Sequence, residues 1–246
     1  MTEQAPLFPS WPEESFASRL SEGQWHGFQS LGAYQKVGSG LLLYRAGTHA
    51  TNLLIIISGT VTLTERLPHD GLVGVRHSGD LLGDREVLSW ASRSPYPPAQ
   101  APCYRESACA ITPVKVLRIP ALHFNQCIEY QPSLWRAIAA DLHCRLAAAE
   151  KVRAEGGQGA PRRLAQALLA LWPRDGRITD REELLVTQGQ LASWIGVSRE
   201  TVERILRGWR SRGIVQTRYG RIEVRKRAKL QQLAGQDSSE ELSNVA

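Results

Sequence analysis

The stretch TQGQLASWIGVSRETVERILRGW, residues 187–209, decides the fold of the C-terminal part of the chain. Thr187, followed three residues later by a glutamine, is typical of a capped helix start. Gly196 then supplies a tight turn, and Ser198 is placed to cap a second helix. Ala192, a glycine four residues later and a valine six residues after that let two helices cross closely. This spacing predicts a helix-turn-helix.

The second helix of this motif has one apolar and one charged face. On a helical wheel, one sector holds the apolar side chains of Val202, Ile205, Leu206 and Trp209. The opposite sector holds only charged side chains, those of Arg199, Glu200, Glu203, Arg204, Arg207 and Arg210. Residues 213–227, GIVQTRYGRIEVRKR, predict a basic hairpin that turns at Tyr219 and Gly220. A solvated helix beside an ordinary hairpin is the alternative, but the caps, the turn, the apolar face and the basic hairpin together favour a winged motif whose charged face enters a DNA major groove.

Upstream, residues 40–90 alternate short β-rich runs with turns. The runs end in glycines at Gly47, Gly59, Gly71, Gly79 and Gly83, and VKVLRI at 114–119 reads as a closing strand. Many short strands with turn signals predict a small barrel or jelly roll. Four prolines within residues 89–104 predict a loop that interrupts it.

Two helices should follow the strands. Residues 121–130 predict a short helix, and Pro132 should begin a long one that ends near residue 155. One face of the long helix is apolar apart from Arg145, which interrupts it; its members are Leu134, Trp135, Ile138, Leu142, Leu146, Ala149 and Val152. This face could cover the helix's own β-domain, but its length of about five turns favours a partner helix, so residues 132–155 predict a dimer seam.

The glycines of AEGGQGAP, residues 154–161, predict a hinge between domains. We therefore expect an α+β protein with an effector-sensing β-roll and dimer helix over 1–155 and a winged helix-turn-helix over 156–229. Residues 230–246 are expected to form a disordered tail.

The composition suits an anionic partner. The chain has 246 residues, a net charge of +6 and a pI near 9.4. It contains no apolar run long enough for a membrane helix, and its acidic, proline-containing start is unlike a signal peptide. We expect a cytoplasmic protein with no membrane partner, in which the thiols of Cys103, Cys109, Cys127 and Cys144 are reduced packing groups.

The sequence resembles the CRP/FNR family, the cyclic-AMP receptor protein and its relatives, over residues 25–229. VSRETVERIL is similar to the family's recognition helix, LGDREVL to the start of its phosphate-binding cassette, and the apolar face of the long helix to its dimerisation helix. The resemblance implies a homodimeric transcription regulator that binds double-stranded DNA, reads half-sites containing G-T-G-A and contacts bases through Arg199, Glu200 and Arg204. Backbone contacts are expected from Thr187, Gln188, Ser198, Arg207, Arg218 and Arg221.

The resemblance also implies an effector site in the β-roll. Gly83 matches the cassette glycine, Asp84 or Glu86 the carboxylate that contacts ribose, and Arg105 in YRES is the nearest candidate for the phosphate-binding arginine. The proline-rich loop displaces that arginine, and Glu150 lies near the place where nucleotide-binding relatives offer hydroxyls. These departures argue against cyclic AMP and leave the effector unknown.

The cysteines and histidines of the sequence raise alternative chemistries. An iron–sulfur sensor needs a cluster of cysteines near the N-terminus, and none precedes Cys103. A haem sensor, a redox pair of Cys103 and Cys109, or a metal- or small-molecule-binding cupin-type enzyme using the β-roll remain alternatives; the single histidine in THAT, residues 48–51, is too few for a cupin metal site. No cofactor, metal ligand or catalytic residue is assigned, and residues 173–183 are a candidate surface for RNA polymerase.

Overall fold

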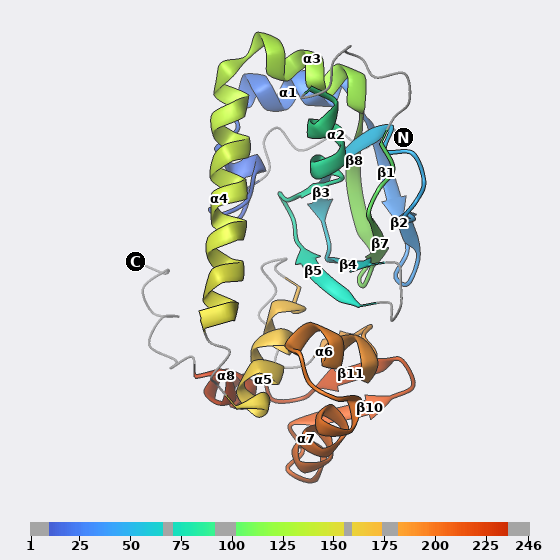
Figure 1. Ribbon diagram of the computed structural model, residues 1–246, viewed down its shortest axis with the longest axis vertical. Helices are drawn as coiled ribbons and strands as arrows, with labels where there is room; N and C mark the ends of the chain where they lie inside the picture. Colours follow the sequence, from blue (N-terminus) through green and yellow to red (C-terminus); the bar gives the residue numbers. More distant parts are fainter. Residues whose placement is uncertain (1–9, 66–70, 92–101, 155–158, 174–181, 236–246) are drawn as a thin grey trace.

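The computed structural model describes residues 10–65, 71–91, 102–154, 159–173 and 182–235. Figure 1 shows a β-rich domain above a smaller, mostly helical domain, with one long helix along the side of the upper domain. The mixed helix and sheet class predicted from the sequence is confirmed.

The upper domain is a roll of two antiparallel sheets. The first has the strand order β1-β8-β3-β6, formed by Ala33–Val37, Val114–Pro120, Asn52–Ser58 and Leu81–Leu82. The second has the order β2-β7-β4-β5, formed by Leu42–Tyr44, Glu106–Ala110, Val61–Glu65 and Leu72–Arg76. The predicted strands, including the closing one, are confirmed. Gly59, Gly79 and Gly83 end their runs at positive φ, which few other residues adopt at low cost.

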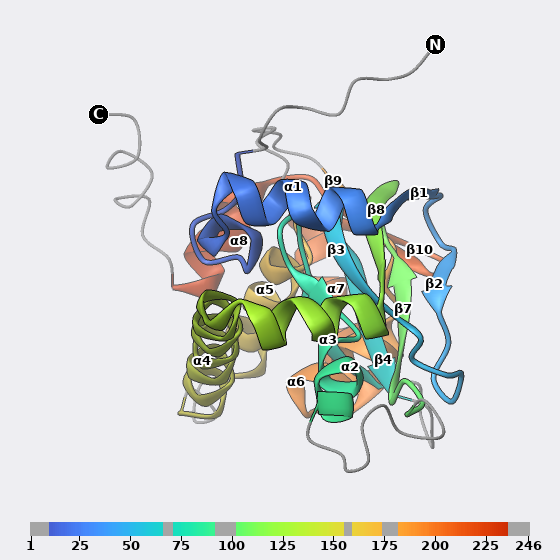
Figure 2. The ribbon, with the colours of Figure 1, turned by 90° about the horizontal axis from the view of Figure 1, so that it is seen from above.

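Helices cover one end of the roll (Figure 2), and the longest of them runs along its side (Figure 1). They are a 3-10 turn at Ala17–Arg19, α1 at Glu22–Leu31, α2 at Asp84–Ala91, α3 at Ala121–Tyr130 and α4 at Pro132–Ala154. The sequence reading anticipated α3 and α4 but not α1, which begins with a capping box at Ser21. The ring of Phe28 in α1 stacks on that of Phe124 in α3, with ring centroids 5.5 Å apart.

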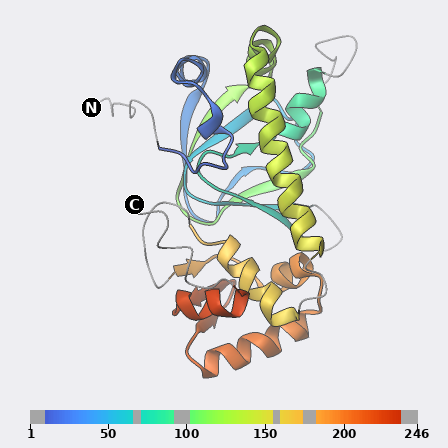
Figure 3. The same cartoon turned by 90° about the vertical axis from the view of Figure 1, so that its left-hand side faces the viewer.

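The apolar residues of α4 lie on two different faces, not on one. Leu134 and Ile138 are buried in the core of the roll, and the dimer seam expected along this helix stays a prediction. Trp135, Leu142 and Leu146 are 44%, 42% and 56% exposed. Ala149 is also exposed, whereas the side chain of Val152 lies outside the described residues. Successive helical residues are about 100° apart, so Leu134 and Trp135 cannot serve the same contact. Figure 3 shows α4 in front of the roll, with its outer side uncovered by other elements.

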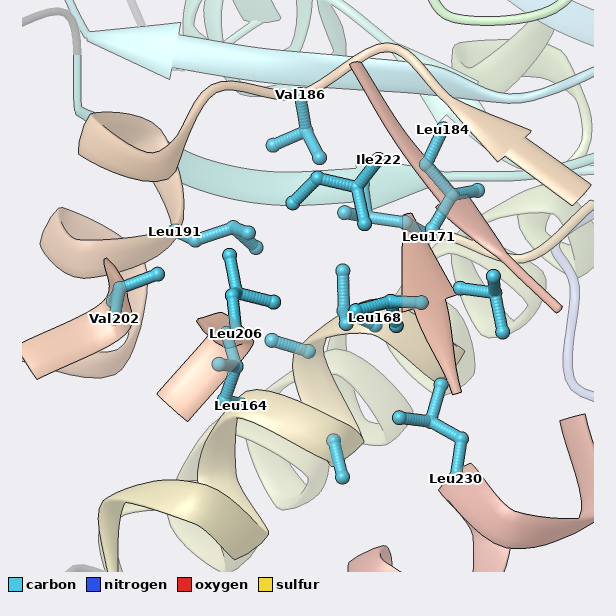
Figure 4. Packing of buried hydrophobic residues seen from close by; sticks show 14 of the residues in the cluster. Leu164, Leu168, Leu171, Leu184, Val186, Leu191, Val202, Leu206, Ile222 and Leu230 are labelled. Atoms are coloured by element: carbon cyan, nitrogen blue, oxygen red, sulfur yellow. The ribbon is translucent and has the colours of Figure 1, made fainter. Parts of the chain in front are cut away.

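The lower domain is built around a three-stranded sheet and the crossed pair α6 and α7. Its elements are α5 at Ala160–Ala170, β9 at Glu182–Leu184, α6 at Gln188–Ile195, α7 at Arg199–Ser211, β10 at Val215–Arg218, β11 at Arg221–Val224 and α8 at Arg227–Ala234. The sheet order is β10-β11-β9. Figure 4 shows Leu164 and Leu168 of α5 meeting Leu191 of α6 and Leu206 of α7 in one apolar core.

The prediction that a disordered tail begins at residue 230 is wrong at its first residues, which are still helical. α8 runs through Ala234, and Leu230 is fully buried in the core of the lower domain. Its apolar positions are few, so the stretch reads as polar although its buried side anchors it to α5. Residues 236–246 lie outside the described part of the chain.

The two domains share a packed joint. Leu72 of β5 and Ile111 after β7 are 3% and 4% exposed and belong to the core of the lower domain. His77 donates from Nε2 to the carbonyl oxygen of Ala170, the last residue of α5, at 3.0 Å. The lower domain is thus packed against the β4–β5 side of the roll. No helix in the described residues is long and apolar enough to cross a membrane.

Candidate nucleic-acid interface and effector pocket

The helix-turn-helix has the local geometry that its sequence predicts. Thr187 Oγ1 accepts from the Gln190 amide at 3.1 Å, which closes the capping box of α6. Gly196 has φ 67° and ψ 47°, a left-handed conformation that reverses the chain. Ser198 Oγ then accepts from the Thr201 amide at 3.2 Å and caps α7. These short-range contacts fix the angle at which α7 leaves the turn.

The apolar face of α7 holds the helix to its domain and leaves the charged face free. Val202, Leu206 and Trp209 are at most 1% exposed. Arg199, Glu200 and Arg204 are all exposed on the first turns of the helix. Figure 1 shows α7 at the end of the molecule that lies away from the roll. Within the described part of the chain, the two arginines have no hydrogen-bond or ion-pair partner, so their guanidinium groups are available to a ligand.

Glu200 is held in its ionised form. Its own backbone amide, the Ser198 hydroxyl and the neighbouring Arg199 lower the pKa of its carboxyl group. A carboxylate accepts hydrogen bonds only. The first two turns of α7 therefore offer two forked donors and one acceptor, the pair of functions that reads guanine and cytosine edges.

The predicted backbone-contacting residues surround this face but differ in their freedom. Arg218 is exposed beside the two-residue turn of the β10–β11 hairpin. Arg207 pairs with Glu203 at 2.9 Å and Arg221 with Glu183 at 2.9 Å, so each would share its charge between protein and phosphate. Thr187 and Ser198 act as helix caps, and Gln188 is half-buried in the first turn of α6.

The structure brings most of the predicted effector residues together beside α2. Asp84, Glu86 and Arg105 line a cavity of about 530 Å³ that also reaches Leu142 of α4. Glu86 Oε1 accepts from the Arg105 amide at 3.4 Å, whereas the Arg105 side chain is exposed. Burial raises the pKa of Glu86. Glu150 is exposed and does not line this cavity.

Arg145, which interrupts the apolar pattern of α4, ties that helix to the roll. Its Nη2 atom donates to Asp84 Oδ2 at 2.6 Å, and its Nε atom lies 3.3 Å from Asp141 Oδ2. Asp141 is 4% exposed, and burial raises its pKa to about 6 although Arg145 opposes the change. Asp84, one of the two carboxylates expected to meet a ribose, is therefore already paired.

The inner wall of the roll beside the cassette glycine is filled by aromatic rings, which sequence reasoning missed. Tyr104 stacks on Tyr44 with ring centroids 3.9 Å apart. A Cβ atom at Gly83 would lie 2.7 Å from Tyr104 Cε1, so only glycine fits against this ring. Tyr104 Oη donates to the carbonyl oxygen of Asn52 at 2.6 Å, which fixes the ring in place. A single tyrosine before a strand gives no sequence signal of such a role.

The alternative chemistries gain no support from geometry. No group of three or more potential metal ligands occurs among the residues that the structure covers. Cys103, Cys109, Cys127 and Cys144 are free thiols, and burial raises the pKa of Cys109 and Cys127. Cys103 lies beside His49, whereas Cys109 is in β7 opposite Leu42 and Thr62.

A winged helix-turn-helix with a free arginine-bearing helix, joined to a two-sheet roll, defines a DNA-binding regulator with a ligand-type domain. Two family models match the chain: a cyclic nucleotide-binding domain over residues 34–131 and a Crp-like helix-turn-helix domain over residues 162–233. The chain belongs to the CRP/FNR family of DNA-binding transcription regulators, which are generally not enzymes.

Solved structures share the fold. The c-di-GMP-responsive global regulator CLP of Xanthomonas campestris is 19% identical with a TM-score of 0.62, covering 83% of this chain and 99% of its own. A CRP/FNR-family regulator of Eubacterium rectale is 18% identical with a TM-score of 0.63, covering 89% and 96%. A CRP-family regulator of Thermus thermophilus is 22% identical with a TM-score of 0.59, covering 82% and 96%. No curated relative matches the sequence significantly.

Proposed function

We propose that the protein is a homodimer that binds an inverted repeat with GTGA-like half-sites and regulates transcription from it. The observation that carries this proposal is the free charged face of α7. Arg199 and Arg204 each present a planar fork to O6 and N7 of guanine, and ionised Glu200 accepts from the N4 amine of cytosine. Arg207, Arg218 and Arg221 lie further along the helix or in the hairpin and meet phosphates, which adds affinity without base preference.

The exposed face of α4 supports the dimer. Trp135, Ala139, Leu142, Leu146 and Ala149 are all exposed and follow one another at intervals of four, three, four and three residues. That alternation is the spacing of a coiled-coil seam. Two copies joined along it are related by a two-fold axis, so the two copies of α7 meet half-sites about one helical turn apart.

The β-roll is the effector domain in this proposal. One structural relative is described as c-di-GMP-responsive, which supports a regulatory role for the roll but not the same ligand. Cyclic AMP is not the effector in this proposal. The Tyr104 ring fills the space beside Gly83, and the Asp84 carboxylate already forms an ion pair with Arg145. The regulator would act in the cytoplasm, with RNA polymerase as a further partner. Its candidate surface, residues 173–183, lies almost wholly outside the described residues.

Selection from a random DNA library tests the function. The wild-type protein should enrich an inverted repeat. Arg204→Ala should lose the preference at one guanine, because a bidentate pair contributes about 1–3 kcal/mol of discrimination. Arg212→Ala is the matched control, since its Nε atom donates to the Gly208 carbonyl at the far end of α7. Failure to enrich a repeat, or an unchanged preference in Arg204→Ala, would refute the assignment of α7 as the reading helix.

A further inference from the structure

A second cavity has Tyr104 in its wall but none of the cassette residues Gly83, Asp84 and Glu86. It has a volume of about 240 Å³ and lies between the two sheets, lined by residues of β2, β3 and β8. Tyr44 and Tyr104 form part of its wall, together with Leu43 and Leu54. Pockets for drug-sized ligands measure roughly 300–1,000 Å³. This cavity therefore suits a ligand smaller than a nucleotide.

The polar lining of this cavity is cationic. Arg45, Arg118 and His49 line it with Thr48, Thr51 and Asn52, and no carboxylate is among its described lining residues. Among the described residues, the one side-chain hydrogen bond of Arg118 is a long one to the Gln35 side chain, 3.4 Å. Arg45 has no side-chain hydrogen bond or ion pair within the described part of the chain. Guanidinium groups bind phosphate and carboxylate through paired, charge-assisted hydrogen bonds.

We propose that this cavity binds a small phosphate oxyanion, either inorganic phosphate or a small phosphate monoester, between Arg45 and Arg118. The hydroxyl of Thr51 adds a donor at the same mouth. The Thr48 hydroxyl already donates to the Arg45 carbonyl oxygen at 2.7 Å, which holds the turn that carries Arg45. Binding at this site does not depend on the proposed function, whereas its regulatory role rests on it.

Tyr104 provides a continuous route from this cavity to α4. Its hydroxyl donates to the Asn52 carbonyl, and its ring presses against Gly83, the residue before α2. The next residue, Asp84, is paired with Arg145 of α4. An anion that draws Arg118 inward changes the surroundings of the Tyr104 ring. Because that ring is packed directly against Gly83, a movement of the ring displaces the backbone at Gly83. Occupancy of the cavity is thereby coupled to the helix that carries the proposed dimer face.

Calorimetric titration of the full chain with inorganic phosphate, and separately with glycerol 3-phosphate, tests the site. Wild-type protein should bind at least one of them with a Kd below about 1 mM. Arg45→Gln and Arg118→Gln should each raise that Kd about tenfold, because each loses a charge-assisted contact. The matched control is Arg105→Gln, which removes an equal charge from the cavity beside α2 and should leave the Kd unchanged. Preference for one probe distinguishes free phosphate from an ester.

Two results would overturn the site: no binding of either probe, or an equal loss of affinity in Arg105→Gln. The regulatory role is tested by DNA affinity with and without the tighter probe at constant ionic strength. Wild type should change by about fivefold or more, and the Arg45→Gln, Arg118→Gln double variant should not. An equal change of DNA affinity in both proteins would mean that the probe acts by screening charges and not by binding in the cavity. If no DNA binds under any condition, the proposed function fails while the calorimetry still decides the site.

Discussion

Arg145, in the middle of α4, donates to Asp84 at the start of α2 across 2.6 Å, and the two residues are 61 positions apart in the chain. The contact joins the helix with the free apolar face to the segment beside the effector cavity. Asp141 shares the same guanidinium at 3.3 Å, and Asp80 and Arg76 also act on its carboxyl group. One buried charge cluster therefore sets how α4 lies on the roll.

The contribution of Asp141 to the free energy of unfolding should fall as pH rises. Its pKa is raised from 3.8 to about 6 in the folded chain, so the folded state binds a proton more tightly than the unfolded state. Its stabilising effect is fully present below pH 4 and is lost as pH rises through about 6. Asp141→Asn removes this dependence. Urea unfolding at pH 4 and pH 7 should show the variant gaining about 2–3 kcal/mol on wild type over that interval. A constant difference would contradict the assignment.

Leu142→Glu should convert the proposed dimer into monomers, because it would place a charge in the proposed apolar seam at a cost of several kcal/mol. Sedimentation velocity measures the result, and operator affinity should fall with it. Leu122→Glu is the matched control, since Leu122 of α3 is 38% exposed, close to the 42% of Leu142, and lies off the seam. A dimer that survives Leu142→Glu would place the contact elsewhere.

Gly196→Ala should destabilise the lower domain by about 1–2 kcal/mol, the cost of a left-handed conformation for an L-residue. No atom lies within 4 Å of the added Cβ, so backbone strain is the only expected contribution. Gly208→Ala, inside α7 and without positive φ, should instead stabilise by up to about 1 kcal/mol. The midpoint temperature of thermal unfolding should fall in Gly196→Ala and rise in Gly208→Ala.

Arg218→Ala should weaken binding to all DNA sequences alike. Arg218 lies beside the hairpin turn, and the proposed function assigns it to a phosphate rather than a base. Loss of one phosphate contact should reduce the slope of log affinity against log salt by about one. Fluorescence anisotropy at several salt concentrations measures this slope. A change of base preference in this variant would show that the hairpin reads sequence.

Cyclic AMP should not bind tightly to the wild-type chain. The ring of Tyr104 lies directly against Gly83, and the Asp84 carboxylate is already paired with Arg145. Calorimetry should detect no sub-micromolar binding. Such binding, abolished by Glu86→Gln or Arg105→Gln, would disprove this view of the cavity.

The local motifs could be predicted because their causes lie a few residues apart. Thr187 caps a helix that starts at the next residue, and Gly196 determines its own turn. α1 was missed although its capping box is equally local, since its polar, glycine-containing sequence has a weak apolar pattern. α8 was missed because only Leu230 and Ala234 are buried in it, too few to give an apolar pattern.

The contacts that the sequence did not reveal are long-range. Periodicity placed Leu134 and Leu142 in one apolar group, but only the position of the roll decides that the first is covered and the second is free. The same holds for the site: Asp84, Glu86 and Arg105 were found by motif, whereas Tyr44, Tyr104 and Arg145 act through partners far away in the chain.

The joint at Leu72 and Ile111 has a consequence for the geometry of DNA recognition. Because these β-roll side chains complete the core of the helical domain, and His77 donates a hydrogen bond to the end of α5, side-chain packing holds α7 in place relative to the roll. In the proposed two-fold dimer, the separation of the two copies of α7 would therefore depend on this joint as well as on the contact between the two copies of α4. The half-site spacing of the proposed operator would then depend on β-roll residues that are not among the proposed DNA contacts.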